Sequence, residues 1–248
     1  MIYCKSFRIL AAAKTLAAIL FFLLTSFSAG AQSLSVVPVN ILFSPGQKAT
    51  SLTVTNQATS ETAIQIRAYA WSQKGDDDPL TATDAVIVSP PLAKIAPGAT
   101  QVIRIILRAL PEDREASYRI LIDQIPPPGE PGIVHIALRL SIPIFAKPSV
   151  RAFADVQFHL ERDSGQIYLV ALNAGNLHEK IRDIVLTTSD GRKLNSDSGT
   201  SPYVLSGATR RWHIAAQDSV PLQSEPLQLT AHSDTGSIDE QVSFVASR

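Results

Sequence analysis

The segment from Val134 to Phe145 alternates strictly between two kinds of position. Aliphatic residues occupy every even position from 134 to 144, whereas the odd positions carry a mixture of polar, small and apolar residues. A repeat of two residues places alternate side chains on opposite faces of a β-strand. The pattern therefore predicts a strand, and it leaves two interpretations open. Either the even face packs in the core of this protein, or its aliphatic side chains are offered to another protein.

The first 31 residues have the three parts of a secretory signal peptide. A basic start precedes an apolar run over residues 16–27, and the small residues Ala29-Gly30-Ala31 follow. The basic residues are Lys5, Arg8 and Lys14. A single membrane anchor is the alternative interpretation, but the run is short for a bilayer. We therefore expect residues 1–31 to be removed before Gln32. We expect no stable membrane insertion afterwards, because no later stretch is apolar enough to span a membrane.

Charge and cysteine content argue against several functions. Cleavage removes three of the 22 basic residues and none of the 22 acidic ones, so the mature chain has no general attraction to nucleic acid. It also removes Cys4, the single cysteine, so no disulfide or thiolate site is expected. The five histidines lack metal-ligand spacing, and neither a Gly-x-Ser-x-Gly motif nor a phosphate-binding glycine loop is present. We expect no metal, no cofactor and no catalytic residues.

From residue 34 onward the sequence consists of short strand patterns separated by turn residues. About seven strands fit into the first part of this region, which is typical of an immunoglobulin-like sandwich. Pro38 favours an edge position for the first strand, because proline has no N–H to donate. Lys147-Pro148 marks a hinge, after which the β pattern continues more weakly. We predict an all-β chain with one sandwich over residues 32–147 and a second over residues 148–248.

Three polar motifs have a structural and a functional interpretation. The loop 74–79 contains three consecutive aspartates, but a calcium loop needs spaced oxygen ligands, so we expect a solvated loop. Arg210-Arg211-Trp212 favours a solvated face with cation–π packing over a ligand site. His178 lies in a polar turn, and we expect it to be a hydrogen-bonded turn residue.

Several short landmarks occur in a characteristic order through most of residues 34–148 and more thinly up to residue 215. They are Phe43, Val54-Thr-Asn56, Trp71, Val88-Ser-Pro-Pro91, Pro97-Gly98, Arg114-Glu115, Gln124-Ile-Pro126, the alternating strand, Phe145-Ala-Lys-Pro148 and Asn173-x-Gly175-Asn176-x-His178. In this order they resemble the periplasmic chaperones of chaperone–usher pilus assembly. The resemblance implies two immunoglobulin-like β-sandwich domains in an L-shaped (boomerang) arrangement. It also implies a periplasmic location, with pilus subunits and an outer-membrane usher as partners.

The resemblance assigns a role to the alternating strand. In that family the last strand of the first domain is lent to a pilus subunit, whose sandwich lacks one strand. Carried onto this sequence, the donated residues are Val134, Ile136, Leu138 and Leu140. Main-chain hydrogen bonds would supply affinity while the side chains fill pockets. Each buried aliphatic side chain would contribute about 1.5–3 kcal/mol before the costs of association.

The resemblance also points to charged residues around the hinge. Glu115 and Lys147 match positions that form an ion pair between the domains. The basic residues that anchor the subunit's terminal carboxylate are missing, because Asn40 stands at the arginine position and Pro143 at the lysine position. A buried carboxylate still needs a cationic donor. We expect Arg119, placed opposite residues 139–141 by strand pairing, to take this role.

Two further arginines and two other classes of protein complete the expectations. Arg139 and Arg104 are the weaker candidates for the carboxylate anchor. A secreted structural or adhesive immunoglobulin-like protein is the alternative function, although a chain with two tryptophans offers little for an aromatic carbohydrate platform. A metal-dependent hydrolase built on a β-sandwich is a third possibility, which metal analysis of the purified protein would test.

Overall fold

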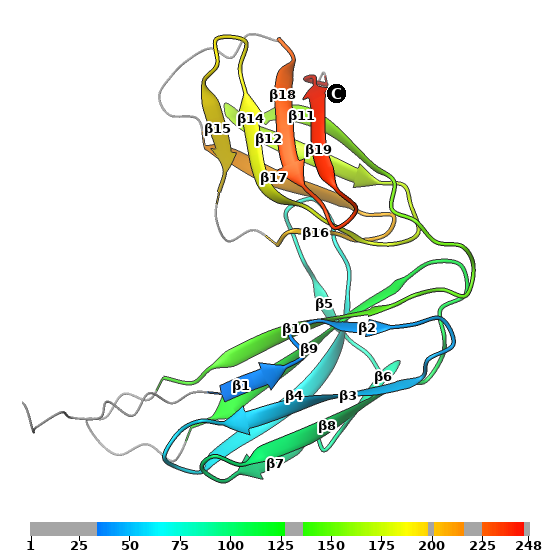
Figure 1. Ribbon diagram of the computed structural model, residues 1–248, viewed down its shortest axis with the longest axis vertical. Helices are drawn as coiled ribbons and strands as arrows, with labels where there is room; N and C mark the ends of the chain where they lie inside the picture. The colour runs from blue at the N-terminus through cyan, green and yellow to red at the C-terminus, as the bar shows by residue number, and fades with distance from the viewer. Residues whose placement is uncertain (1–33, 127–135, 198–200, 216–224, 246–248) are drawn as a thin grey trace, which may run out of the picture.

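The computed structural model describes residues 34–126, 136–197, 201–215 and 225–245. Within these ranges every regular element is a β-strand. The strands form two separate bodies that meet at an angle, so the chain has the shape of an L (Figure 1). This arrangement confirms the predicted all-β fold with two immunoglobulin-like sandwiches. The signal peptide expected over residues 1–31 lies outside the described residues.

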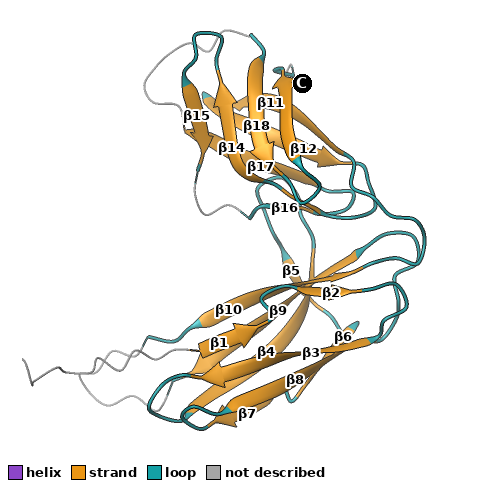
Figure 2. Ribbon diagram, viewed as in Figure 1, coloured by secondary structure: helices purple, strands orange, loops and turns teal. Residues whose placement is uncertain are grey.

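The first sandwich consists of two layers of strands (Figure 2). One sheet contains, in spatial order, β1 (Leu34–Val37), β3 (Ala49–Asn56), β8 (Thr100–Leu107) and β6 (Val86–Ser89). The other sheet contains β2 (Ile41–Phe43), β10 (Arg139–Ala146), β9 (Ala116–Ile125), β4 (Thr62–Trp71) and β5 (Leu80–Ala82), and β7 (Leu92–Ile95) also pairs with β4. As predicted from Pro38, β1 is an edge strand. The chain then crosses to the second sheet, where β2 lies beside β10.

Alternating aliphatic residues from both sheets form the core of the first sandwich. Ile103 and Ile105 of β8 face Ile120 and Ile122 of β9 across the two layers, and all four are fully buried. Their neighbours in sequence lie on the other face of each strand, as the period of two requires, and among them Leu121 is also buried. Ile142 of β10 belongs to the same core, so at least part of the alternating segment has the ordinary role of a core strand.

The second sandwich is one long sheet that curves until its ends meet. Its spatial order is β11 (Val156–Asp163), β12 (Gln166–Asn173), β17 (Thr209–Ala215), β15 (Lys193–Ser196), β14 (Arg182–Thr187), β18 (Leu227–His232) and β19 (Ser237–Val242). Beyond β19 the chain reaches β11, where the Leu160 N–H donates to Ser243 O at 2.9 Å and the Val245 N–H donates to Leu160 O at 2.9 Å. A two-stranded ribbon of β13 (Glu179–Lys180) and β16 (Tyr203–Val204) covers one end.

The strand pattern of the second sandwich is less legible in the sequence. The last strand is predicted at residues 242–246, whereas β19 occupies Ser237–Val242. Four of its six residues are polar or charged and most are exposed, which obscures a period of two. The strand β15, with the sequence KLNS, is not predicted, because it buries a single aliphatic residue, Leu194.

Candidate functional site

Among the described residues, one edge of the strand β10 is unpaired over most of its length. One side pairs with β9 from Arg139 to Ala146. On the other side β2 pairs only with the last three residues, from Ile144 to Ala146. Within the described part of the chain, residues 139–143 therefore present one unpaired strand edge, which is where another strand can add to a sheet.

The apolar face of this segment passes from the core into solvent. Ile142 and Ile144 are buried in the core, and Leu140 is partly buried against it. Leu138 is half-buried, and Ile136 is 80% exposed. Val134 lies outside the described residues. The same alternating face thus fills the sandwich near the hinge and is uncovered farther from it, so the two interpretations of the sequence apply to different parts of one segment.

Arg119 lies on the neighbouring strand at the hinge end of this edge. Its backbone pairs with Pro143, not with residues 139–141 as predicted, because the pairing of the two strands is centred near residue 131 rather than Gly129. The guanidinium lies 3.8 Å from the Trp71 ring centroid, and it donates to Ser141 Oγ at 3.1 Å. Burial lowers the pKa of Arg119, and the nearby Asp78 counteracts that effect. The side chain is therefore a cation held over the face of an aromatic ring.

The other two arginine candidates are already engaged or lie elsewhere. Arg139 forms an ion pair with Asp123, which also accepts a hydrogen bond from Arg67 at 2.7 Å. Burial would raise the pKa of Asp123, but these two arginines hold it below the ordinary value. Arg104 is exposed on β8, in the sheet that does not contain β10. Its strand belongs to the layer opposite β10, so Arg104 stays the weaker candidate for the carboxylate anchor.

A cleft of about 920 Å³ separates the two sandwiches beside Arg119. Its first wall combines apolar and charged residues of the first sandwich: Val39, Asp76, Asp78, Leu80, Arg119, Ser141 and Pro143. Its second wall is mainly polar: Tyr168, Ser201, Pro202, Tyr203, Arg210, Arg211 and His213. Within the described residues, the cleft arginines of the second wall have carboxylate partners within 4 Å, whereas Arg119 has none.

The loop between β4 and β5 crosses from the first sandwich to the second on the cleft side (Figure 1). Gln73 donates from Nε2 to Tyr203 O at 2.8 Å and accepts from the Leu205 N–H at 2.8 Å. Its side-chain amide thus makes the two kinds of main-chain hydrogen bond that a neighbouring β-strand would make. Asp78 binds Arg210 at 2.7 Å, and the Arg211 N–H donates to Gly75 O at 3.4 Å. The loop is solvated only in part, because Asp76 and Asp77 are exposed whereas Asp78 is half-buried, and Arg210 of the expected solvated pair is buried. Cation–π packing does occur at Arg211, whose guanidinium lies 4.1 Å from the Tyr168 ring centroid. The acidic loop and the basic pair bind each other, although Asp78 and Arg210 are 132 positions apart in the sequence.

An aromatic cluster lies directly under this contact. Trp71 packs against Phe145 and Tyr203 with ring centroids 5.8 and 5.7 Å apart. Leu205 completes this small core, which joins residues of both sandwiches. The Trp71 indole N–H donates to Asp78 Oδ1 at 3.0 Å, so a hydrogen bond links the aromatic cluster to the ion pair. The sequence signal that could reveal this joint is an acidic run in one half and a basic pair in the other, both without an assigned role.

A second contact between the sandwiches lies at the hinge. Glu115 accepts from the His178 N–H at 3.0 Å and contacts His178 Nδ1 at 2.6 Å. The His178 ring stacks on Phe145 with centroids 3.5 Å apart. The predicted hydrogen-bonded turn histidine is therefore present. The predicted ion pair between Glu115 and Lys147 is not, because the Glu115 carboxylate is buried at the interface whereas Lys147 is exposed.

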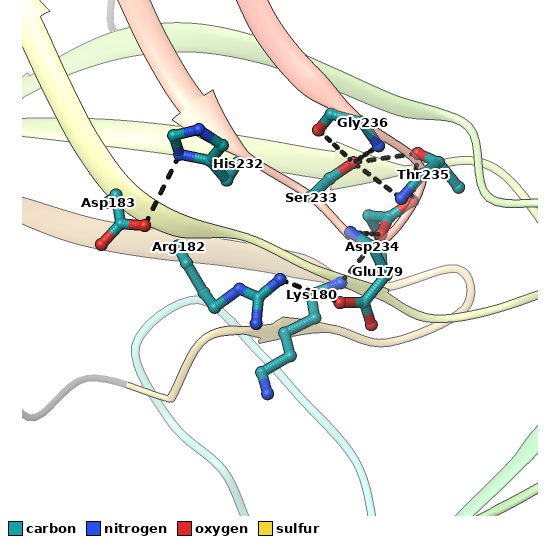
Figure 3. A network of polar contacts seen from close by, with 9 residues as sticks. All are labelled: Glu179, Lys180, Arg182, Asp183, His232, Ser233, Asp234, Thr235 and Gly236. Atoms are coloured by element: carbon teal, nitrogen blue, oxygen red, sulfur yellow. Dashed lines mark hydrogen bonds and ion pairs between the residues drawn. The ribbon is translucent and has the colours of Figure 1, made fainter.

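One further polar network in the second sandwich is structural. Glu179 is buried, and its carboxylate accepts from the Asp234 N–H at 3.0 Å and the Thr235 hydroxyl at 3.1 Å in the turn between β18 and β19 (Figure 3). This arrangement satisfies backbone and side-chain donors of a tight turn. Across the described ranges, no group of three histidine, cysteine or acidic residues is placed to hold a metal ion. In the same ranges no helix is long and apolar enough to cross a membrane.

Comparison with known proteins matches the first part of the sequence to one family. Residues 33–151 match the family described as pili and flagellar-assembly chaperones, PapD N-terminal domain. The chain belongs to this chaperone family. Family members are chaperones, not enzymes. The matched range contains β10, Arg119 and the hinge residues Lys147 and Pro148.

The curated relatives of this chain are named as chaperones. The chaperone protein FaeE of Escherichia coli is 30% identical over 181 residues, which cover 70% of this chain and 66% of FaeE. The chaperone protein PapD of Escherichia coli is 27% identical over 113 residues, or 44% of this chain and 46% of PapD. The chain thus spans about half to two thirds of the length of the curated relatives it matches.

Solved chaperone structures share the fold over almost their whole length. A chain of the CsuC–CsuE chaperone–tip adhesion subunit complex of Acinetobacter baumannii gives a TM-score of 0.63 at 22% identity, covering 87% of this chain and all of that one. The Salmonella enterica complex of the SafA pilin with the SafB chaperone gives 0.57 at 16% identity, covering 88% and 99%. At these identities the comparison establishes the two-sandwich fold.

Proposed function

We propose that this protein is a periplasmic chaperone that binds pilus subunits by strand addition. The observation that carries the proposal is the free edge of β10, whose apolar face continues from the core into solvent at Leu138 and Ile136. A soluble protein gains nothing for its own fold from an aliphatic side chain that is 80% exposed next to an open strand edge. A partner that lacks one strand would cover both features at once.

The donated side chains divide into two groups. Ile136 and Leu138 are available to fill pockets in the partner. Val134 lies outside the described residues, and its place in the donated set rests on the sequence pattern. Leu140 packs partly against the core of this protein, so it supports the strand at the junction. Burying the two described residues would contribute about 1.5–3 kcal/mol each before the cost of association. Main-chain hydrogen bonds along the edge would add to this without depending on the partner's sequence.

Arg119 supplies the charge for the partner's terminal carboxylate. It lies at the hinge end of the free edge, and Trp71 and Ser141 hold it in place. The other arginines that line the cleft already form ion pairs with carboxylates of this chain. A carboxylate that enters the cleft along the edge therefore meets an uncommitted guanidinium, which has several N–H donors left.

The setting of this activity is also part of the proposal. Cleavage after Ala31 would release the chain into the periplasm, where it would capture subunits as they arrive. The loaded chaperone would then deliver them to an outer-membrane usher. The expected domain limits, residues 32–147 and 148–248, divide the molecule at the hinge. The first domain would hold the donor strand and both domains would form the cleft.

Subunit protection tests the role of the edge. The double variant Ile136→Asp, Leu138→Asp should leave the chaperone folded, because both positions lie beside the core and not in it. Co-expressed with a pilus subunit from the same genome, it should fail to protect the subunit from proteolysis. The double variant Ile87→Asp, Ile106→Asp is the matched control, since both residues are exposed on the other sheet. Subunit survival with the first variant would exclude strand donation.

Affinity measurements test the anchor. Arg119→Ala should weaken subunit binding by at least about tenfold, equivalent to about 1.4 kcal/mol, because the partner's carboxylate loses its cationic donor. Arg119→Lys should restore part of the affinity, since it retains the charge but not the planar stacking. Arg104→Ala, on the opposite sheet, is the control and should have no effect. Equal affinity for Arg119→Ala and the parent protein would show that Arg119 is not the anchor.

A further inference from the structure

The direction of the main-chain groups along β10 follows from one hydrogen bond. The Gln124 N–H donates to Leu138 O at 2.9 Å. Residues 124 and 138 are directly opposite in the register that pairs Asp123 with Arg139, so they form a hydrogen-bonded pair. In an antiparallel ladder such pairs alternate with pairs whose N–H and C=O groups point away from each other. Even residues of β10 therefore direct these groups to β9, and odd residues direct them to the free edge.

The opposite end of the strand agrees with this assignment. The Lys147 N–H donates to Phe43 O at 3.1 Å, so an odd residue points to β2, which occupies the same edge farther along. In the part of β10 that β2 does not pair with, the main-chain groups that point to the free edge thus belong to Arg139, Ser141 and Pro143. Proline has no N–H. The series of main-chain N–H donors on this edge therefore ends at Ser141. The next residue that points to the edge is Pro143, and β2 pairs with the residues after it.

We propose that Pro143 ends the donated edge and sets the register of the bound strand. The inference rests on the proposed function and specifies how the partner lies. The partner strand would run parallel to β10 towards the hinge. Its last residue would donate its N–H to Ser141 O, and its carboxylate would face Pro143. Since no main-chain N–H exists there, the carboxylate would be bound by Arg119, the cross-strand partner of Pro143.

Two features of the structure select this register. Beyond Pro143 the edge is occupied by β2, so a partner strand has no space to continue. Arg119 already reaches back to Ser141 Oγ at 3.1 Å, so its guanidinium lies beside the last outward donor and not beyond it. A carboxylate bound there requires the partner to approach from the Ile136 side. A chain running from there to the hinge is parallel to β10.

The mature chain is suited to mapping this register, because it lacks cysteine once residues 1–31 are removed. Ser141→Cys can be combined with synthetic peptides of about ten residues that alternate valine and threonine and end in a free carboxylate. A single cysteine is placed at the last, second-last or third-last position. Residues directly opposite in a sheet lie at a distance compatible with a disulfide. The second-last position should give the fastest cross-linking.

A double-mutant cycle tests the part played by Pro143. Pro143→Ala restores an N–H that can bind the carboxylate. The loss of peptide affinity caused by Arg119→Ala should therefore fall from about tenfold in the parent to below about threefold in the Pro143→Ala background. Pro126→Ala, an exposed proline after β9, is the matched control and should leave the tenfold loss unchanged. A peptide ending in an amide should behave with the parent protein like the free peptide with Arg119→Ala.

The outcomes separate this inference from the proposed function. If the peptide does not bind, or if Ile136→Asp, Leu138→Asp leaves its affinity unchanged, strand donation itself fails. If the peptide binds through the edge but cross-links fastest at another position, the proposed register is wrong. If the Arg119→Ala loss is the same with and without Pro143→Ala, Pro143 has no role in directing the carboxylate.

Discussion

The ion pair between Asp78 and Arg210 provides a direct test of how the two sandwiches are joined. The Arg210 side chain is 3% exposed, and Asp78 binds it at 2.7 Å. The same carboxylate accepts hydrogen bonds from the Trp71 indole at 3.0 Å and from the Gln73 amide at 2.9 Å. Asp78→Ala therefore leaves a buried guanidinium and two further donors without their acceptor. We expect this variant to be clearly less stable than the parent protein.

The size of the effect follows from burial. Removing one partner of a fully buried ion pair costs about 3–5 kcal/mol, because the remaining charge stays buried without compensation. Asp78 is 26% exposed, so water entering from the cleft would compensate part of this loss. We expect a decrease of about 2–4 kcal/mol in the free energy of unfolding. With a urea dependence of about 2 kcal/mol per molar, the midpoint of unfolding would fall by about 1–2 M.

Urea unfolding followed by tryptophan fluorescence measures this change. Trp71 reports on the joint, and Trp212 reports on the core of the second sandwich. Asp77→Ala is the matched control, because Asp77 is an exposed acid in the same loop, and we expect a change within about 0.5 kcal/mol. If Asp78→Ala and Asp77→Ala gave the same midpoint, the ion pair would not contribute to joining the sandwiches, and the reasoning from burial would be refuted.

Three other substitutions probe the fold and the hinge. Burial opposes ionisation of Asp123, but its two arginine partners hold its pKa below the ordinary 3.8. The ion pairs of Asp123 therefore stabilise the fold above about pH 4, and this stabilisation is lost as the pH falls and the carboxylate is protonated. Asp123→Asn should therefore lower stability at pH 7 and converge with the parent in acid-unfolding curves as the pH falls through the lowered pKa of Asp123. Gly175→Ala should destabilise much more than Gly191→Ala in thermal unfolding, because an added Cβ at Gly175 would lie 2.4 Å from Phe153 O, whereas at Gly191 it would meet open space and only the strain of a positive φ. His178→Ala should cost about 2 kcal/mol in urea unfolding, because the buried Glu115 carboxylate loses its contact with the imidazole and keeps only the backbone N–H of residue 178, and an unchanged midpoint would argue against a joint at the hinge.

Strand type and fold class could be predicted from the sequence because they depend on local periodicity. The alternation of Ile120 and Ile122, like that of Ile142 and Ile144, fixes which face of each strand is buried, whatever lies elsewhere in the chain. The resemblance carried by landmarks such as Phe43 also predicted how the two sandwiches are arranged. The weakly amphipathic strands of the second sandwich were harder to predict, since edge strands with polar side chains carry little periodic signal.

The charged contacts could not be predicted from the sequence, because they depend on how the two sandwiches meet. Asp78 and Arg210 are 132 positions apart, and no local pattern pairs them. Glu115 has a histidine of the second sandwich as its partner, because the His178 ring also packs flat on Phe145. Ion pairs are selected by distance and burial after packing has brought the strands together, so a charged residue has many possible partners in a sequence and few in a structure.

The alternating segment shows the same division. Its sequence determined that residues 134–145 favour a strand with one aliphatic face, since side chains alternate along any extended backbone. The tertiary structure decided where that face is covered: Ile142 lies in the core, Ile136 lies in solvent, and β2 closes the edge beyond Pro143. It also placed Arg119 opposite Pro143. Coverage and strand register are properties of packing between distant segments, and the period of one strand does not encode them.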